Sequence, residues 1–207
     1  MIIGLIAILG ATIFSGICYR VWKRRIRDRE KRTSPVRLMV VLGSGGHSGE
    51  MLKILQKMDF SKYSPRCYVV ALGDESSCTK AEDLESGSKD HFIEKIYRSR
   101  KLHQSYISSI FSTLWATRQC ISLVWKFRPD LVLCNGPGTC VPVCIVAALF
   151  SIIFPSREHC KIVFLESFCR VRSISLTGKI LQYIADLFVV QWPELEGKDK
   201  KYVGRLF

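Results

Sequence analysis

The stretch Arg37-Leu-Met-Val-Val-Leu-Gly-Ser-Gly-Gly-His-Ser-Gly-Glu-Met-Leu52 joins an apolar run to a glycine-rich turn and then to helix-forming residues. The run at residues 36–42 is typical of a buried parallel strand, and the residues after the turn predict a helix at 48–58. A turn that enters a helix N-terminus offers free backbone N–H groups and the positive end of the helix dipole, which bind phosphate. Glycine allows the backbone to approach such a ligand closely. The stretch therefore predicts either a phosphate site or an ordinary strand-to-helix turn of an α/β domain.

The remainder of the chain repeats this alternation of apolar runs and helical patterns. Apolar runs of strand length predict further strands at residues 67–72, 92–96, 130–134, 161–165 and 187–191. Apolar residues at helical spacing predict helices at residues 105–127, 141–154 and 177–185. Residues 75–90 are polar and predict a loop with a short helix. Because strands that alternate with helices form a parallel sheet covered on both faces, the predicted fold class is α/β with a Rossmann-like parallel sheet.

A second glycine-rich turn, Asn135-Gly-Pro-Gly-Thr139, follows the predicted strand at 130–134. In a doubly wound sheet the strand order reverses beside the first strand, and ligands bind there, outside the carboxyl ends of the strands. We expect strand 130–134 to lie across this reversal, so that the two turns meet. The candidate site residues are Ser44, Gly45, Gly46 and His47 in the first turn and Asn135, Gly136, Gly138 and Thr139 in the second.

The first turn departs from the common nucleotide-binding motifs. A Walker-type loop requires Gly-Lys-Ser/Thr, and no lysine follows the turn. The pattern Gly-x-Gly-x-x-Gly fits Gly43 and Gly45, whereas Ser48 occupies the third glycine position. Asp74 follows the second strand, where a ribose-binding acid would lie. A membrane-tethered, nucleotide-dependent oxidoreductase therefore stays open as an alternative function.

The N-terminal segment has the character of a membrane anchor. Residues 1–19 contain no charged side chain, and this length spans a bilayer as a helix. A cleaved signal peptide would carry its positive charge before the apolar run, whereas here the basic residues follow it, between Arg20 and Arg32. We therefore predict a retained transmembrane anchor at 1–22 and a polybasic juxtamembrane linker at 23–35. The positive-inside rule places the N-terminus in the lumen and the body in the cytosol.

The composition indicates one globular domain with a local basic cluster. A chain of 207 residues, 48% of them hydrophobic, has room for one such domain after the anchor. Residues 20–32 contain eight basic and two acidic residues and so carry +6 of the formal net charge of +13. This cluster suits lipid headgroups, and we expect no nucleic-acid partner. Cys140 and Cys144 have no further ligands in a zinc-site pattern, so neither a metal nor a cofactor is expected.

Several motifs along the chain together resemble one family. They are Gly43-Ser-Gly-Gly-His47, Leu131-Val-Leu-Cys-Asn-Gly-Pro-Gly-Thr-Cys-Val-Pro142, Glu166-Ser167 with Cys169-Arg-Val171, Ser175-Leu-Thr-Gly-Lys179 and Val190-Gln-Trp-Pro193. With these motifs the chain resembles the membrane-anchoring subunits of the dolichol-linked UDP-N-acetylglucosamine (UDP-GlcNAc) transferase. The resemblance extends from the anchor to the C-terminus.

The resemblance implies a two-chain glycosyltransferase of the GT-B fold, inactive with this chain alone. This chain would be its N-terminal half, with an acceptor-side Rossmann-like domain at residues 36–197. A soluble catalytic subunit would hold UDP-GlcNAc, and the acceptor would be the lipid-linked GlcNAc-diphospho-dolichol. The complex would add the second GlcNAc on the cytosolic face of the endoplasmic reticulum (ER) membrane. A pure membrane scaffold with a vestigial pocket stays open as a second alternative.

Within this frame we assign roles to individual residues. Ser44, Gly45, Gly46 and His47 would bind the acceptor diphosphate, and the second turn would form the wall of the acceptor site. His47 and Glu166 are the candidate catalytic residues, because imidazole and carboxylate groups act as general bases. The alternatives are an imidazole that only orients the turn and a carboxylate that holds a neighbouring loop. Arg170 and Arg172 are candidate phosphate contacts.

The C-terminal tail at residues 198–207 is basic, and its last six residues, Tyr202-Val-Gly-Arg-Leu-Phe207, are apolar for a free chain end. The resemblance implies that it docks on the catalytic subunit through Tyr202, Val203, Leu206 and Phe207. A frayed terminus is the alternative.

Overall fold

The computed structural model describes residues 34–98, 106–136, 138–154 and 160–206. The predicted anchor at 1–22 and nearly all of the linker at 23–35 lie outside these residues, so both stay predictions. Of the helices within the described ranges, none is long and apolar enough to cross a membrane.

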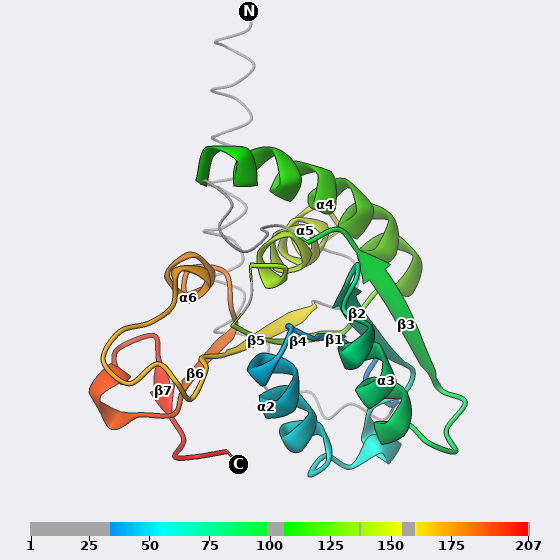
Figure 1. Cartoon of the computed structure of the whole chain (residues 1–207), viewed down its shortest axis with the longest axis horizontal. Helices are drawn as coiled ribbons and strands as arrows, with labels where there is room; N and C mark the ends of the chain where they lie inside the picture. The colour runs from blue at the N-terminus through cyan, green and yellow to red at the C-terminus, as the bar shows by residue number, and fades with distance from the viewer. Residues whose placement is uncertain (1–33, 99–105, 137, 155–159, 207) are drawn as a thin grey trace, which may run out of the picture.

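The described part of the chain is built on a single parallel sheet of seven strands (Figure 1). The strands are β1 (Leu38–Val41), β2 (Arg66–Ala71), β3 (His91–Ile96), β4 (Leu131–Asn135), β5 (Lys161–Leu165), β6 (Leu187–Val190) and β7 (Lys201–Tyr202). Their order is β3-β2-β1-β4-β5-β6-β7, and every described pair is parallel. The strand order therefore reverses between β1 and β4, as the sequence predicted for a Rossmann-like sheet.

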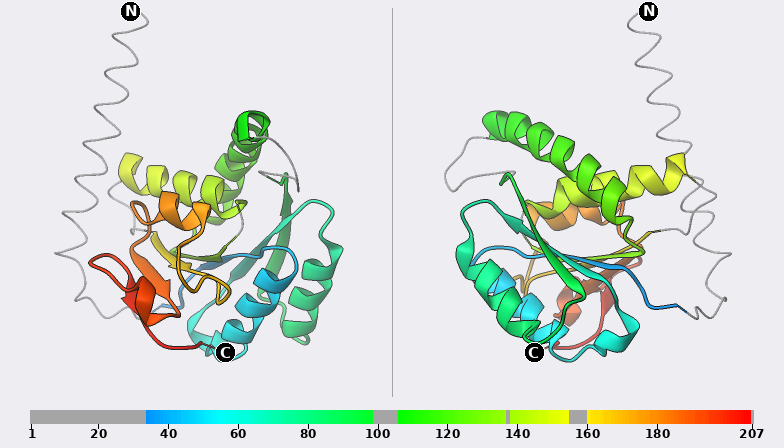
Figure 2. Two further views of the ribbon diagram at one scale, coloured as in Figure 1. Left: turned by 60° about the vertical axis from the view of Figure 1, so that its left-hand side comes forward. Right: turned by 90° about the vertical axis from the view of Figure 1, so that its right-hand side faces the viewer.

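Helices cover both faces of the sheet, as Figures 1 and 2 show. One face carries α2 (Gly46–Leu55) and α3 (Glu75–Leu84), and the other carries α4 (Tyr106–Phe127), α5 (Cys140–Ile153) and α6 (Leu176–Leu181). Alternate residues of β1 enter the two cores, since Leu38 and Val40 pack toward α2 whereas Met39 and Val41 pack toward α5. All four of these side chains are fully buried, which explains the continuous apolar run.

Two segments differ from the expectation. Residues 75–90 were expected to form a loop with a short helix, and the helix α3 takes up ten of them, residues 75–84. The Asp74 side chain accepts a hydrogen bond from the Ser77 backbone N–H (3.2 Å) and caps this helix. The tail adds β7, which pairs with β6 through the registers Val189–Lys201 and Val190–Tyr202. The sheet therefore extends past residue 197, where we placed the end of the Rossmann-like domain, into the tail.

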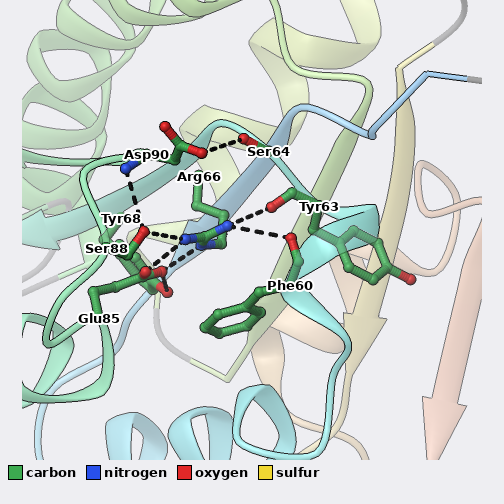
Figure 3. Close-up of polar contacts among 8 residues, drawn as sticks. All are labelled: Phe60, Tyr63, Ser64, Arg66, Tyr68, Glu85, Ser88 and Asp90. Atoms are coloured by element: carbon green, nitrogen blue, oxygen red, sulfur yellow. Dashed lines mark hydrogen bonds and ion pairs between the residues drawn. The ribbon is translucent and has the colours of Figure 1, made fainter.

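A buried ionic network supports the start of β2, at the edge of the sheet opposite the strand ends that carry the site. Figure 3 shows the Arg66 guanidinium donating to Glu85 Oε2 (2.6 Å), to Ser88 Oγ (2.9 Å) and to the Tyr63 carbonyl (2.6 Å). The Tyr68 hydroxyl donates to Glu85 Oε1 (2.6 Å). Burial raises the pKa of Glu85, but the hydrogen bonds from Arg66 and Tyr68 outweigh it, so the net pKa lies below its ordinary value.

Candidate functional site

The first glycine-rich turn opens at the carboxyl end of β1 and leads directly into α2. Gly45 adopts φ 65°, a conformation that favours glycine, and α2 begins at the next residue. No side chain caps this helix N-terminus, and its first turn contains no acidic residue. Ser44, Gly45 and Gly46 are exposed. The turn therefore presents backbone N–H groups and the positive end of a helix dipole at the surface, a geometry that binds anions.

The second glycine-rich turn contacts the first. Asn135, at the end of β4, donates from Nδ2 to the His47 backbone carbonyl at 2.9 Å. Gly136 has φ 70°, and a Cβ at this position would overlap Cε1 and Nδ1 of the His47 imidazole. The structure thus brings together His47, Asn135 and Gly136 at the reversal between β1 and β4.

Two other residues of the second turn are placed differently from each other. Gly138 is exposed, whereas Thr139 is buried at the N-terminus of α5, where its side chain makes no cap hydrogen bond. Gly138 therefore lies on the accessible surface of the candidate wall, and Thr139 lies beneath it.

Glu50 was not singled out from the sequence, yet it connects α2 to the ends of two strands, β4 and β5. Its Oε2 accepts from Asn135 Nδ2 (3.3 Å) and its Oε1 accepts from Ser167 Oγ (2.9 Å), which follows β5. Glu50 lies one helical turn after His47 on α2, and residues at this spacing share a helix face. That spacing was the available signal in the sequence. The contact with Ser167 could be found only from the fold.

Glu166 has the contacts of a loop-holding carboxylate. The residue is buried; its Oε2 accepts from the backbone N–H (2.9 Å) and Oγ (3.1 Å) of Ser175, and its Oε1 accepts from the Ser167 N–H (3.2 Å). Ser175 in turn caps α6 by accepting from the Gly178 N–H (2.9 Å). These contacts correspond to the alternative that the sequence left open, a carboxylate that fixes the loop between β5 and α6.

Arg170 and Arg172 lie on that same loop and are exposed. A loop that Glu166 fixes at both ends holds these arginines near the carboxyl ends of the strands. Their predicted role as phosphate contacts stays a prediction.

Asp74, which the oxidoreductase alternative would assign to a ribose, is engaged in the structure. It is buried, and its carboxylate accepts from both the N–H and the hydroxyl of Ser77. The Ser77 hydroxyl lies 2.6 Å from Ser48 Oγ and 3.2 Å from the Gly43 carbonyl oxygen. This cluster therefore joins the N-terminus of α3 to Gly43 and Ser48, the residues on either side of the first glycine-rich turn.

The predicted docking residues of the tail have different environments. Tyr202 and Val203 are exposed by 37% and 41%. Leu206 packs against the core on the α2 side; its N–H donates to Gln191 Oε1 (3.3 Å), and its carbonyl accepts from Lys57 Nζ (2.9 Å). Phe207 lies outside the described residues. Leu206 therefore anchors the tail to this chain itself.

Fold and site together define a class: a Rossmann-type α/β domain with an uncapped, glycine-rich helix N-terminus at its strand-order reversal. Within the residues that the structure describes, no cluster of histidine, cysteine or acidic side chains could hold a metal ion. The chain belongs to the family described as "Oligosaccharide biosynthesis protein Alg14 like", whose family model matches residues 38–206.

Curated relatives are similar over most of their length. The chain is 42% identical over 199 residues to the human "UDP-N-acetylglucosamine transferase subunit ALG14", covering 90% of each chain. It is 43% identical over 180 residues to the rat protein of that name, covering 82% of each. The Schizosaccharomyces pombe subunit is 40% identical over 201 residues, with 94% of each chain covered.

Solved structures share the fold at low sequence identity. Acinetobacter baumannii MurG superposes with a TM-score of 0.60 at 17% identity, covering 83% of this chain and 45% of that one. The UDP-N-acetylglucosamine 2-epimerase of Rickettsia bellii superposes with a TM-score of 0.52 at 14% identity, again covering 83% and 45%. The chain therefore spans slightly less than half the length of either solved protein.

Proposed function

We propose that this chain is the membrane-anchoring, acceptor-binding subunit of a two-chain UDP-GlcNAc transferase. In this proposal the complex adds the second GlcNAc to GlcNAc-diphospho-dolichol on the cytosolic face of the ER membrane. The chain recruits a soluble catalytic subunit that holds UDP-GlcNAc. The observation that carries the proposal is the meeting of two glycine-rich turns at the open N-terminus of α2, in a chain whose curated relatives are named as UDP-N-acetylglucosamine transferase subunits.

The size of the domain supports the requirement for a second chain. The described residues form one Rossmann-type sheet, and this sheet matches only 45% of the MurG chain. A GT-B enzyme requires a second domain, which a separate subunit would supply. The exposed side chains of Tyr202, in the edge strand β7, and of Val203, the residue after it, are the docking side chains that we propose for that subunit.

An apolar and aromatic surface supports a position at the membrane. The α4–α5 outer face, as we name it, exposes large apolar side chains at Leu114, Trp115, Ile121, Trp125 and Ile153. Arg118 lies over the ring of Trp115 and Arg128 over that of Trp125. Aromatic rings beside cationic side chains suit the headgroup level of an anionic bilayer. We propose that this face lies against the membrane that holds the anchor at 1–22.

The proposed chemistry is an inverting glycosyl transfer. The acceptor 4-hydroxyl oxygen forms a bond to the anomeric carbon of UDP-GlcNAc. The bond from that carbon to the diphosphate oxygen breaks, and its electron pair leaves with UDP. His47 accepts the hydroxyl proton as general base. The N–H groups of the Ser44–Gly46 turn bind the acceptor diphosphate, whose charge is complementary to the helix dipole.

The test is a GlcNAc-transfer assay with UDP-GlcNAc and a short-chain lipid-diphosphate GlcNAc acceptor. We expect transfer by the full chain mixed with its soluble partner subunit and none by either chain alone. Equal transfer by the partner alone would contradict an acceptor-binding role. A change in the fluorescence of a reduced nicotinamide cofactor when the purified chain binds it would instead support the oxidoreductase alternative.

A further inference from the structure

Two buried polar atoms of the site lack partners. Within the part of the chain that the structure describes, His47 Nδ1 and Asn135 Oδ1 are both buried and have no hydrogen-bond partner. Buried polar atoms are nearly always paired, because leaving one unpaired costs stability. An amide oxygen can only accept a hydrogen bond, whereas an imidazole nitrogen that carries a proton donates one. One hydrogen bond between them would therefore satisfy both atoms.

The two residues are held next to each other by independent contacts. Asn135 Nδ2 donates to the His47 carbonyl at 2.9 Å, which links the side chain of one to the backbone of the other. The imidazole lies against Gly136, the residue after Asn135, where a Cβ would overlap Nδ1 and Cε1. The missing Cβ leaves the room in which the ring can rotate toward the Asn135 amide.

The orientation of the Asn135 amide is fixed by its other partners. Its Nδ2 faces two acceptors, the His47 carbonyl at 2.9 Å and Glu50 Oε2 at 3.3 Å. A flipped amide would direct its oxygen at both acceptors, so the nitrogen is assigned by the network itself. Glu50 is held in turn by Ser167 Oγ, which donates to its Oε1 at 2.9 Å. Asn135 Oδ1 therefore stays free to receive a donor.

We propose that Asn135 is a positioning residue for His47. Its Oδ1 accepts a hydrogen bond from the imidazole Nδ1–H, which leaves the lone pair of the ring on Nε2, and Glu50 fixes the amide that does so. The hydrogen bond made by one ring nitrogen sets which nitrogen carries the proton. A base that is oriented by a third group is the general arrangement of activated catalytic sites. The consequence for catalysis rests on the proposed function, in which Nε2 takes the acceptor proton.

The tautomer of His47 tests the proposal without reference to activity. The full chain contains four histidines, so ¹⁵N-histidine labelling gives few signals. The labelled chain, bound to its unlabelled partner subunit in lipid nanodiscs, is compared with a His47→Gln variant, which identifies the His47 signals. We expect a protonated Nδ1 and an unprotonated Nε2 in the wild type. A wild-type His47 that is protonated at Nε2 and unprotonated at Nδ1 would overturn the proposal.

Variants then test the two supporting residues. Asn135→Leu has a similar volume and no acceptor, so we expect the His47 proton to move to Nε2. In the transfer assay this variant should lose about 10²-fold in kcat, with little change in KM, because orientation of a base affects the chemical step. Glu50→Gln should shift the tautomer partially, and Glu82→Gln, at an exposed acid on α3, should leave spectrum and rate unchanged.

The outcomes separate the two proposals. An Asn135→Leu complex that stays assembled and retains the Nδ1-protonated His47 would contradict the positioning role. No transfer by the wild-type complex would contradict the proposed function alone, since the tautomer is read from the spectrum in either case.

Discussion

The contact between the two glycine-rich turns requires a glycine at position 136. Gly136 is buried with φ 70°, and its missing Cβ makes room for the His47 ring. We expect Gly136→Ala to lower the free energy of unfolding by about 1 kcal/mol or more, from the left-handed backbone alone. The displaced imidazole should also lower transfer. Urea unfolding and the transfer assay measure the two effects.

For stability, the matched control is Gly138→Ala in the same turn. A Cβ there meets nothing within 4 Å, and its φ lies outside the left-handed region. Its unfolding free energy should stay within error of the wild type. Equal stability of the two variants would show that the conformation of Gly136 is not needed.

Glu85 provides a residue-scale prediction of pH dependence. Because its folded pKa lies below the ordinary value of 4.5, its contribution to stability is present above that pH and is lost as the pH falls through the folded pKa. Glu85→Gln leaves the buried Arg66 without its counter-ion, which should cost about 3 kcal/mol at pH 7. The difference between variant and wild type should shrink as the pH falls below 4.5.

Equilibrium urea unfolding between pH 3 and pH 7 measures this difference. Glu75→Gln is the control, since Glu75 pairs with Lys95 at an exposed site (70% and 41% exposed side chains) and its loss should have little effect at any pH. A Glu85→Gln difference that stays constant over the whole range would contradict the assigned ionic network.

The tail, at the scale of an element, combines an edge strand with one core contact. Val203→Asp places a charge on the exposed docking side chain and leaves the β6–β7 pairing in place. We expect it to reduce co-purification of the soluble subunit at an unchanged unfolding midpoint. Leu206→Ala removes a half-buried side chain and should cost about 1 kcal/mol of stability. Continued co-purification with Val203→Asp would exclude Val203 from docking.

The α4–α5 outer face predicts a pattern of lipid contact. In vesicles that contain brominated lipids, we expect Trp115→Phe and Trp125→Phe each to reduce the quenching of tryptophan fluorescence, because bromine quenches rings at the headgroup level. Trp192→Phe is the control variant, because Trp192 packs against Phe168 beside the tail and its Nε1 donates to the Phe168 carbonyl at 2.7 Å. Equal quenching in all three variants would contradict a membrane-facing α4–α5 surface.

Much of the element structure could be predicted from the sequence, because buried parallel strands are continuous apolar runs. The strands β1 to β6, the helix α4 and the reversal beside β1 follow from such patterns. A short helix was expected within residues 75–90, but the ten-residue extent of α3 could not be predicted, since the segment is polar and the Asp74 cap hydrogen bond is seen only in the structure. The strand β7 is two residues long and too short to show a period.

The meeting of the two glycine-rich turns could be predicted from the sequence, whereas the side-chain contacts around them could not. Glycine and histidine in the two turns were visible as local patterns, and the fold brings them together. Glu50 could not be recognised as a site residue from the sequence, because its partners Asn135 and Ser167 are 85 and 117 residues away. Glu166 could not be assigned, since only the structure shows that Ser167 and Ser175 occupy its oxygens.

The whole molecule, as the structure describes it, is one Rossmann-type domain with distinct surfaces. The carboxyl ends of the strands carry the open helix N-terminus, the tail edge carries Tyr202 and Val203, and the α4–α5 outer face carries the exposed aromatic residues. In the proposed function these surfaces meet the acceptor diphosphate, the catalytic subunit and the bilayer, respectively. A scaffold would need the last two surfaces but not the first.

The most direct test of this account is the rate of GlcNAc transfer by the complex when the first turn is altered and assembly is intact. Gly45 has φ 65° and α2 begins at the next residue, so Gly45→Val both strains the turn and covers its N–H groups. With Gly45→Val we predict a loss of at least about 10²-fold in kcat/KM for the lipid acceptor, equivalent to roughly 3 kcal/mol of transition-state stabilisation, and undiminished co-purification of the partner subunit. Full transfer by the assembled variant would contradict the account and identify the chain as a scaffold.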